Sequence, residues 1–402
     1  MWKPIINQNE EIFRVQQKLK QIYADIVRYP MTEQYGLMSG YASILLFLFH
    51  YQQFTGRKEH EELFFQKFSD FYQNFTKTLY PSFSAGFAGI GWLLRYFHKK
   101  GVFDVDNIDD ILSDIDLFTM GFLNYHSKNS SFDYLHEGLG EAYYFATTDN
   151  HKFDSALNIF FQHLNANKEV IATETNCWAK ETYVNNTTIG RVYNMSLSHG
   201  MAAIMPCCIK YLQHRDSELV RNILIGTMNY FKMNALDDSH SSVFPKWIDP
   251  DTYAAHESPL SWCYGDPGMA QALFQAGEFI GDSDVVDLAL KALLKASLRR
   301  DVNKEYIKEA CFCHGSSSLL HIFNRMYQKT QLSAFKEAAI FWLEDTLSKG
   351  QYSSEFAGYQ FYDNGDPNSN ISLLAGLSGV GLALISAINN QEPAWDECVL
   401  LS

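Results

Sequence analysis

Three residues in the second half of the chain could bind a metal ion together. Cys263 and Cys313 each stand two residues before a glycine in a repeated phrase, and His314 directly precedes the second of these glycines. Two thiolates and one imidazole favour zinc over magnesium or calcium. Three protein ligands also leave a fourth coordination position open, as in catalytic zinc sites. The alternative is that both cysteines are small buried apolar side chains and that His314 is a core histidine.

The phrase that carries these residues occurs seven times. Each copy has a glycine, two variable residues, a small residue and an apolar stretch, and only the third copy breaks the small-residue rule, with Glu141. The glycines are Gly40, Gly86, Gly138, Gly200, Gly265, Gly315 and Gly376. The residues before each phrase are amphipathic with a helical period, as in residues 10–29, whereas those after it are apolar on every side, as in residues 377–388. This pattern predicts seven pairs of an outer and an inner helix.

Seven such hairpins predict an all-α fold, an α/α toroid in which a ring of seven outer helices surrounds seven inner ones. We expect one toroid domain over residues 1–402, and an open solenoid is the alternative. In a toroid, equivalent positions lie side by side at one end, so Cys263 and Cys313 would meet, with His199 one copy away. Long polar loops precede several phrases. The stretch 165–197 is where we expect a small inserted domain.

The overall composition excludes several classes of protein. The chain has 32 Lys and Arg against 46 Asp and Glu, for a net charge of −14, and no basic run that could bind nucleic acid. No apolar run is long enough to span a membrane. The first residues lack the apolar segment of a signal peptide, so we expect a cytoplasmic location. In that reducing compartment, cysteines are more often metal ligands or catalysts than disulfides.

The phrases SLSHGMAAI, SWCYGDPGMA and CFCHG, in this order on a sevenfold glycine repeat, resemble the lanthionine synthetase C-like family. This family includes the cyclases of lanthipeptide biosynthesis, and the resemblance covers essentially the whole chain. It implies an α/α toroid with one Zn²⁺ in its central cavity. The metal ligands implied by the matching motifs are Cys263, Cys313 and His314. The implied catalytic residues are His199, Asp133 and Tyr264.

The reaction implied by the resemblance adds a peptide cysteine thiol to a dehydroalanine or dehydrobutyrine and closes a thioether ring. A free thiol is only partly ionised at neutral pH, and coordination to zinc deprotonates it. Attack at the β-carbon leaves an enolate that needs a proton, for which His199 is the candidate donor. Asp133 either orients His199 or shifts the pKa of His199 by its charge, or it acts on its own. Tyr264 either donates a hydrogen bond to the enolate oxygen or packs beside the zinc.

The implied substrate is a dehydrated precursor peptide with its leader, and a dehydratase and exporter complex are further candidate partners. The alternative function is a glutathione-binding or glutathione-adding member of the family that acts on proteins containing dehydroamino acids. Pro259 stands where family members often carry an arginine, four residues before the zinc cysteine. Cys311, two residues before Cys313, is a second candidate ligand.

Overall fold

The computed structural model describes residues 2–30, 32–77, 80–184, 187–351, 356–363, 366–368 and 370–402. Among these residues, no helix has both the length and the apolar character needed to cross a membrane. The chain divides into two compact units. Unit 1 comprises Met1–Tyr80, Ser84–Asp104 and Ser297–Val399. Unit 2 comprises Pro81–Phe83, Val105–Ala296 and Leu400–Ser402.

Outer and inner helices alternate along the described chain, as the repeat predicts. The outer helices are α1 (Asn9–Arg28), α3 (Lys58–Tyr72), α6 (Ser113–Lys128), α8 (Asp154–Ala166), α10 (Glu218–Met233), α12 (Ser283–Ser297) and α14 (Ser333–Lys349). The inner helices are α2 (Tyr41–Thr55), α4 (Phe87–Lys99), α7 (Gly138–Ala146), α9 (Ile204–His214), α11 (Asp266–Ile280), α13 (Ser316–Thr330) and α15 (Leu377–Ile388). Short elements complete the helical part: α5 (Ile108–Ile111), η1 (Phe75–Lys77), η2 (His151–Phe153), η3 (Met201–Ala203), η4 (Phe356–Gly358) and η5 (Trp395–Val399).

The two classes of helix differ in burial. All residues of α15 are buried, so this helix is covered on every side. The buried residues of α1 form one stripe at helical spacing, Val15, Leu19, Ile22 and Ile26, and its other residues are half-buried or exposed. The difference follows from the sequence, because only the inner segments are apolar all round.

The repeated glycines are required by a close backbone approach rather than by unusual dihedral angles. A Cβ atom on Gly376 would lie 2.3 Å from the carbonyl oxygen of Asn370, six residues earlier. A Cβ on Gly379, the small residue of the same phrase, would lie 2.0 Å from the carbonyl oxygen of Leu373. The loop before α15 therefore folds back over the first helical turn, and larger side chains would push it away. The same close approach of a carbonyl six residues earlier recurs at Gly40, Gly200, Gly265 and Gly315.

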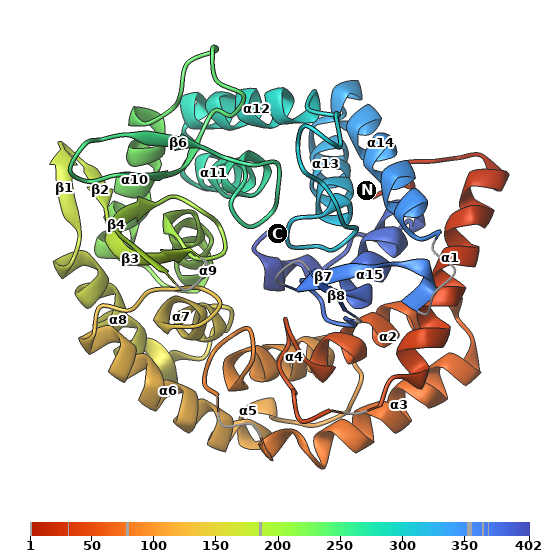
Figure 1. Ribbon diagram of the computed structural model, residues 1–402. Coiled ribbons are helices and arrows are strands. Elements are labelled where there is room, and N and C mark those ends of the chain that lie inside the picture. Colours follow the sequence, from red (N-terminus) through yellow and green to blue (C-terminus); the bar gives the residue numbers. More distant parts are fainter. Residues whose placement is uncertain are drawn as a thin grey trace. The chain divides into compact units, whose positions relative to one another are not determined.

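Unit 1 brings the last repeat against the first. Helix α15 packs against both α13 and α2, and α2 packs against α4 (Figure 1). An open solenoid would leave its terminal repeats apart, so the contact between α15 and α2 favours a closed ring.

The ring position is visible in the backbone hydrogen bonds of unit 1. Residues that stand two before the phrase glycine bond to one another in neighbouring repeats. The Cys313 amide donates to the carbonyl of Leu374 at 2.8 Å, and the Leu374 amide donates to that of Met38 at 3.3 Å. The Met38 amide in turn donates to the carbonyl of Ser84 at 2.9 Å. Within this unit, equivalent positions are thus neighbours, as the toroid requires.

Unit 2 contains α7, α9 and α11 as successive neighbours, together with most of the strands. Strands β1 (Glu169–Ala172) and β2 (Thr175–Cys177) form an antiparallel pair. An antiparallel sheet of order β3-β4-β5-β6 joins two loops; its strands are β3 (Ala179–Val184), β4 (Thr187–Asn194), β5 (Pro245–Ile248) and β6 (Ala255–Glu257). A further pair, β7 (Phe361–Asp363) and β8 (Asp366–Asn368), belongs to unit 1.

The sequence did not lead us to expect these strands, which occupy the long loops between outer and inner helices. Strands β1 to β4 fall inside the stretch 165–197, of which residues 185 and 186 lie outside the described residues. An inserted domain at this stretch, and a single domain over residues 1–402, stay predictions.

Candidate active site

The loops before α9 and α11 are joined where their functional residues lie. The amides of Leu197 and Ser198 both donate to the carbonyl of Cys263, at 2.9 and 3.2 Å. His199 and Cys263, on neighbouring repeats of unit 2, are therefore held by one backbone junction. This junction places the candidate acid–base histidine close to a candidate metal ligand, as the repeat predicts.

A serine fixes the turn before each of these two helices. The His199 amide donates to the hydroxyl of Ser196, and the Tyr264 amide donates to the hydroxyl of Ser261, each at 3.3 Å. Both serines stand four residues before the phrase glycine, and such side-chain acceptors compete with helical bonding just outside a helix. The turn therefore holds His199 and Tyr264 at the start of their helices.

Asp133 and His199 form a hydrogen-bonded pair within unit 2. Nδ1 of His199 donates to Oδ2 of Asp133 at 2.7 Å, and the Asp133 side chain is only 8% exposed. Oδ1 of Asp133 accepts the amides of Leu135 and His136 at 2.8 and 2.9 Å. Because a carboxylate can only accept, His199 must carry its proton on Nδ1, and Nε2 holds the lone pair of the neutral ring. The structure thus places the predicted pair together.

The pair shifts both pKa values in the directions expected for opposite charges. Burial lowers the pKa of His199, but the hydrogen bond to Asp133 and its negative charge outweigh burial and leave this pKa raised. Burial raises the pKa of Asp133, but the hydrogen bond and charge of His199 outweigh it and hold this pKa well below its usual range. Asp133 therefore extends the pH range over which His199 stays protonated.

Two charged residues lie beside the pair, and one of them, Lys180, was not identified from the sequence. Nζ of Lys180, on β3, lies 2.8 Å from Oε2 of Glu137 and 3.5 Å from Oδ2 of Asp133. Oε2 of Glu137 also accepts the Asp133 amide at 3.1 Å. Lys180 lies in a loop outside the repeat, so no equivalent position pointed to it. Its positive charge opposes the charge of Asp133 at His199 and lowers the pKa of that histidine.

Two aromatic rings flank His199. The ring of His136 stacks on it with 5.5 Å between centroids, and burial lowers the pKa of His136. The ring of Tyr264 lies 5.9 Å from that of His199, tilted by 38°. Tyr264 is thus close to the imidazole, although this contact does not decide between its two predicted roles.

Unit 1 supplies the other two candidate ligands. Cys313 and His314 lie in the loop before α13, where the backbone bond from Cys313 to Leu374 fixes the turn. Nε2 of His314 lies 3.2 Å from Oε1 of Glu309, a carboxylate in a buried residue. The sequence did not single out Glu309.

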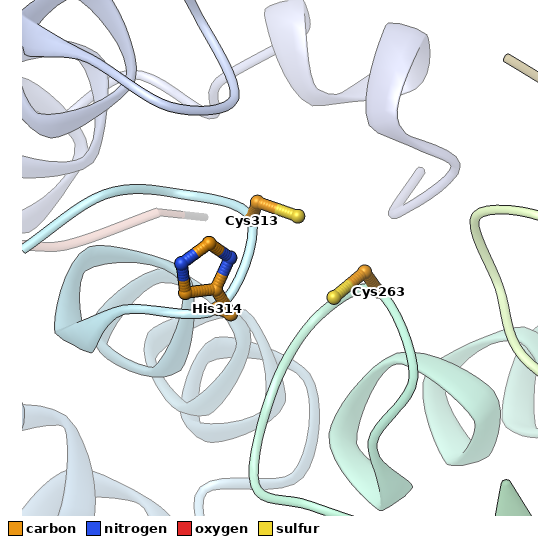
Figure 2. A group of neighbouring side chains, drawn as sticks. All are labelled: Cys263, Cys313 and His314. Carbon is orange, nitrogen blue, oxygen red and sulfur yellow. The ribbon is translucent and has the colours of Figure 1, made fainter. Parts of the chain in front are cut away.

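One ligand atom from each of Cys263, Cys313 and His314 lies within 4.8 Å of the others (Figure 2). The same distance limit also groups Glu309, Cys311 and His314. His314 is common to both groups, and Cys311 is fully buried. The donor atoms of the first group, two thiols and an imidazole, match the ligands that zinc prefers.

Comparison with solved structures bears on the fold. Nisin cyclase matches with a TM-score of 0.72 at 17% sequence identity, covering 96% of this chain and 97% of that one. A structure described as a sugar epimerase from a ruminal bacterium matches with a TM-score of 0.48 at 12% identity, covering 95% and 99%. The likeness to nisin cyclase confirms the predicted fold class, an all-α toroid.

The sequence was also compared with models of protein families. Residues 32–400 match the family described as lanthionine synthetase C-like protein. The match contains all seven phrase glycines and every candidate site residue discussed above. The chain therefore belongs to the lanthionine synthetase C-like family.

Proposed function

We propose that this protein is a zinc-dependent lanthipeptide cyclase. It adds cysteine thiols of a dehydrated precursor peptide to dehydroalanine or dehydrobutyrine residues of the same peptide, forming lanthionine and methyllanthionine rings. The observation that carries the proposal is the Asp133–His199 pair, bonded at 2.7 Å, on the loop that is joined to Cys263. A protein that only bound zinc would have no need of an acid–base pair beside the thiol.

The residues present fit zinc by the chemistry of their donors. Cys263, Cys313 and His314 would hold the ion and leave one position open for a substrate thiol. When bound, zinc would lower the pKa of that thiol and keep it as a thiolate at neutral pH. Cys263 also precedes the N-terminus of α11, whose positive end favours a thiolate.

His199 would donate the proton that completes the addition. Attack of the thiolate on the β-carbon moves negative charge toward the carbonyl oxygen, and the α-carbon must then be protonated. Asp133 raises the pKa of His199 and so favours the protonated ring. Its hydrogen bond holds Nδ1, which leaves Nε2 as the nitrogen that would donate the proton. Asp133 is then a positioning residue that also stabilises the imidazolium. Tyr264 would donate a hydrogen bond to the oxygen that gains charge.

We further propose that the substrate binds with its leader, that a dehydratase and an exporter complex are partners, and that the protein works in the cytoplasm. The supporting facts are membership of the family and the lack of a membrane-spanning helix in the described residues.

The test combines metal analysis with a cyclisation assay on a dehydrated precursor peptide. Ring closure consumes thiols without changing the mass, so remaining thiols are alkylated and counted by mass spectrometry. We expect one zinc per chain in the wild type and loss of both zinc and ring formation in Cys263→Ala. Cys177→Ala, at a buried cysteine of β2, is the matched control and should keep both.

Two results would contradict the proposal. The first is a purified, active protein without stoichiometric zinc. The second is a Cys263→Ala variant that closes rings as fast as the wild type. If the wild type adds glutathione to a dehydroalanine peptide but closes no ring in a precursor peptide, the alternative glutathione-adding function replaces the proposed one.

A further inference from the structure

Glu309 contacts the one candidate ligand that both metal-binding groups share. Glu309 is 7% exposed, and its Oε1 lies 3.2 Å from Nε2 of His314. Its other oxygen, Oε2, accepts the backbone amide of Tyr362, on β7, at 3.3 Å. The carboxylate therefore joins the ligand histidine to a strand of a different loop, and all three residues belong to unit 1.

The backbone of Glu309 is held in place independently of its side chain. Its carbonyl accepts the amide of Ser316, in the first turn of α13, at 3.1 Å. A Cβ atom on Gly315 would lie 2.5 Å from that carbonyl oxygen, so the loop is pressed against the start of the helix. The carboxylate is thus presented to His314 from a fixed position.

This contact decides which nitrogen of His314 can bind a metal. A carboxylate accepts and does not donate, so Nε2 must carry the proton. In the neutral ring, the lone pair then lies on Nδ1, and Nδ1 becomes the nitrogen that faces an ion. A carboxylate bonded to the far side of a ligand histidine also makes the imidazole more basic and stops it rotating.

We propose that Glu309 is a positioning residue for the metal site: it selects the Nδ1-ligating tautomer of His314 and raises the zinc affinity of the protein. The inference rests on the proposed function in one respect, that His314 is a zinc ligand. Glu309 itself is not a ligand in this proposal, in contrast to the Glu309, Cys311 and His314 group that the geometry also allows.

The first experiment measures zinc affinity by competition with a chromogenic chelator. Loss of an orienting partner typically weakens metal binding about 10- to 100-fold, and we expect this for Glu309→Gln, with partial recovery in Glu309→Asp. The matched control is Glu141→Gln, which removes a buried carboxylate bonded to His126; neither residue belongs to a metal-binding group. A Glu309→Gln protein with the zinc affinity of the wild type would overturn the inference.

The second experiment separates positioning from a general loss of stability. In a His314→Ala background, Glu309→Gln should cause no further loss of zinc affinity, because the carboxylate acts through that ring. An equal loss in both backgrounds would show that Glu309 acts elsewhere and would refute the proposal. Circular dichroism of the metal-free proteins establishes that each variant folds, and Glu309→Asp replaces Glu309→Gln if the latter does not.

The third experiment replaces zinc with Co²⁺ and follows the thiolate-to-metal absorption band. We expect Glu309→Gln to keep the band with weaker binding, Cys263→Ala to reduce it and Cys311→Ala to leave it unchanged. A band that disappears with Cys311→Ala and persists with Cys263→Ala would make Glu309 a direct ligand and overturn the positioning role. Normal zinc content without cyclisation would contradict the proposed function and leave this inference standing.

Discussion

The Asp133–His199 pair can be tested with a single-atom change, Asp133→Asn. The asparagine Oδ1 can still accept the two amides that Asp133 Oδ1 now accepts, so the turn before α7 should persist. The group facing His199 becomes an NH₂ donor in place of a carboxylate oxygen. The ring must then accept at Nδ1 and carry its proton on Nε2, so it is held neutral and is a far weaker acid than the imidazolium that the proposed role requires.

The size of the effect follows from burial and distance. Breaking a buried ion pair by removing one partner costs about 3–5 kcal/mol, and the 29% exposure of the His199 side chain suggests the lower end, about 3 kcal/mol. Asp133 has a lowered pKa and His199 a raised one, so the pair stabilises the fold above the unfolded pKa of Asp and below that of His. The difference in free energy of unfolding between wild type and variant should therefore be largest between about pH 4 and 6.5.

The assays are the NMR titration of the His199 ring, urea unfolding at several pH values and the rate of ring closure. We expect a lower titration midpoint for His199 in Asp133→Asn and a roughly 10²- to 10⁴-fold slower proton-dependent step. In the wild type, the rate should fall as pH rises through the raised pKa of His199. Glu141→Gln is the matched control, since this buried carboxylate bonds to His126 rather than to Asp133 or His199. An unchanged His199 midpoint in Asp133→Asn would refute the reasoning.

Three further outcomes follow from the same contacts. Lys180→Met should raise the titration midpoint of His199, opposite to Asp133→Asn, because the lysine charge now lowers that pKa; a midpoint that falls would contradict this. Gly268→Ala should lower the free energy of unfolding in urea by at least about 1–3 kcal/mol, since the new Cβ would lie 2.0 Å from the Trp262 carbonyl oxygen. Gly121→Ala, in α6 with no atom within 4 Å, should instead raise it by about 0.5–1 kcal/mol, and equal effects at the two glycines would be inconsistent with the packing described. Cys311→Ala should keep one zinc per chain by elemental analysis, and loss of the metal would move the site to the second group.

The helical repeat was predictable because its cause is local. A side chain is disfavoured where its Cβ would meet the carbonyl six residues earlier, as at Gly40, Gly200, Gly265, Gly315 and Gly376. The glycine therefore recurs and leaves a clear signal. Aligning the copies also identified Cys263, Cys313 and His314 as a group, because equivalent positions are neighbours wherever the backbone bonds describe them. The role of Asp133 came only from the family resemblance.

The remaining features depend on contacts that no repeat encodes. Lys180 reaches the site from β3, a strand in a loop without an equivalent in other copies, so its sequence position gave no indication of its partners. Glu309 stands five residues before His314, and its side chain contacts that histidine. Neither its residue type nor this spacing distinguishes it in the sequence from a glutamate that faces solvent. The strands were missed because segments such as residues 179–184 are short and polar, although their β-branched and aromatic residues are typical of strands.

The division of the chain between the two units has a consequence for its synthesis. Apart from two short segments, unit 2 is one continuous stretch, Val105–Ala296, whose partners emerge from the ribosome in succession. Unit 1 joins the first hundred or so residues to Ser297–Val399, and its α2 needs α15 to cover it. Domains fold as units during translation, and distant partners impose a delay. We therefore expect unit 2 to fold first. The apolar surface of α2 stays uncovered until the end of the chain has been made, and in that interval it can bind chaperones or aggregate.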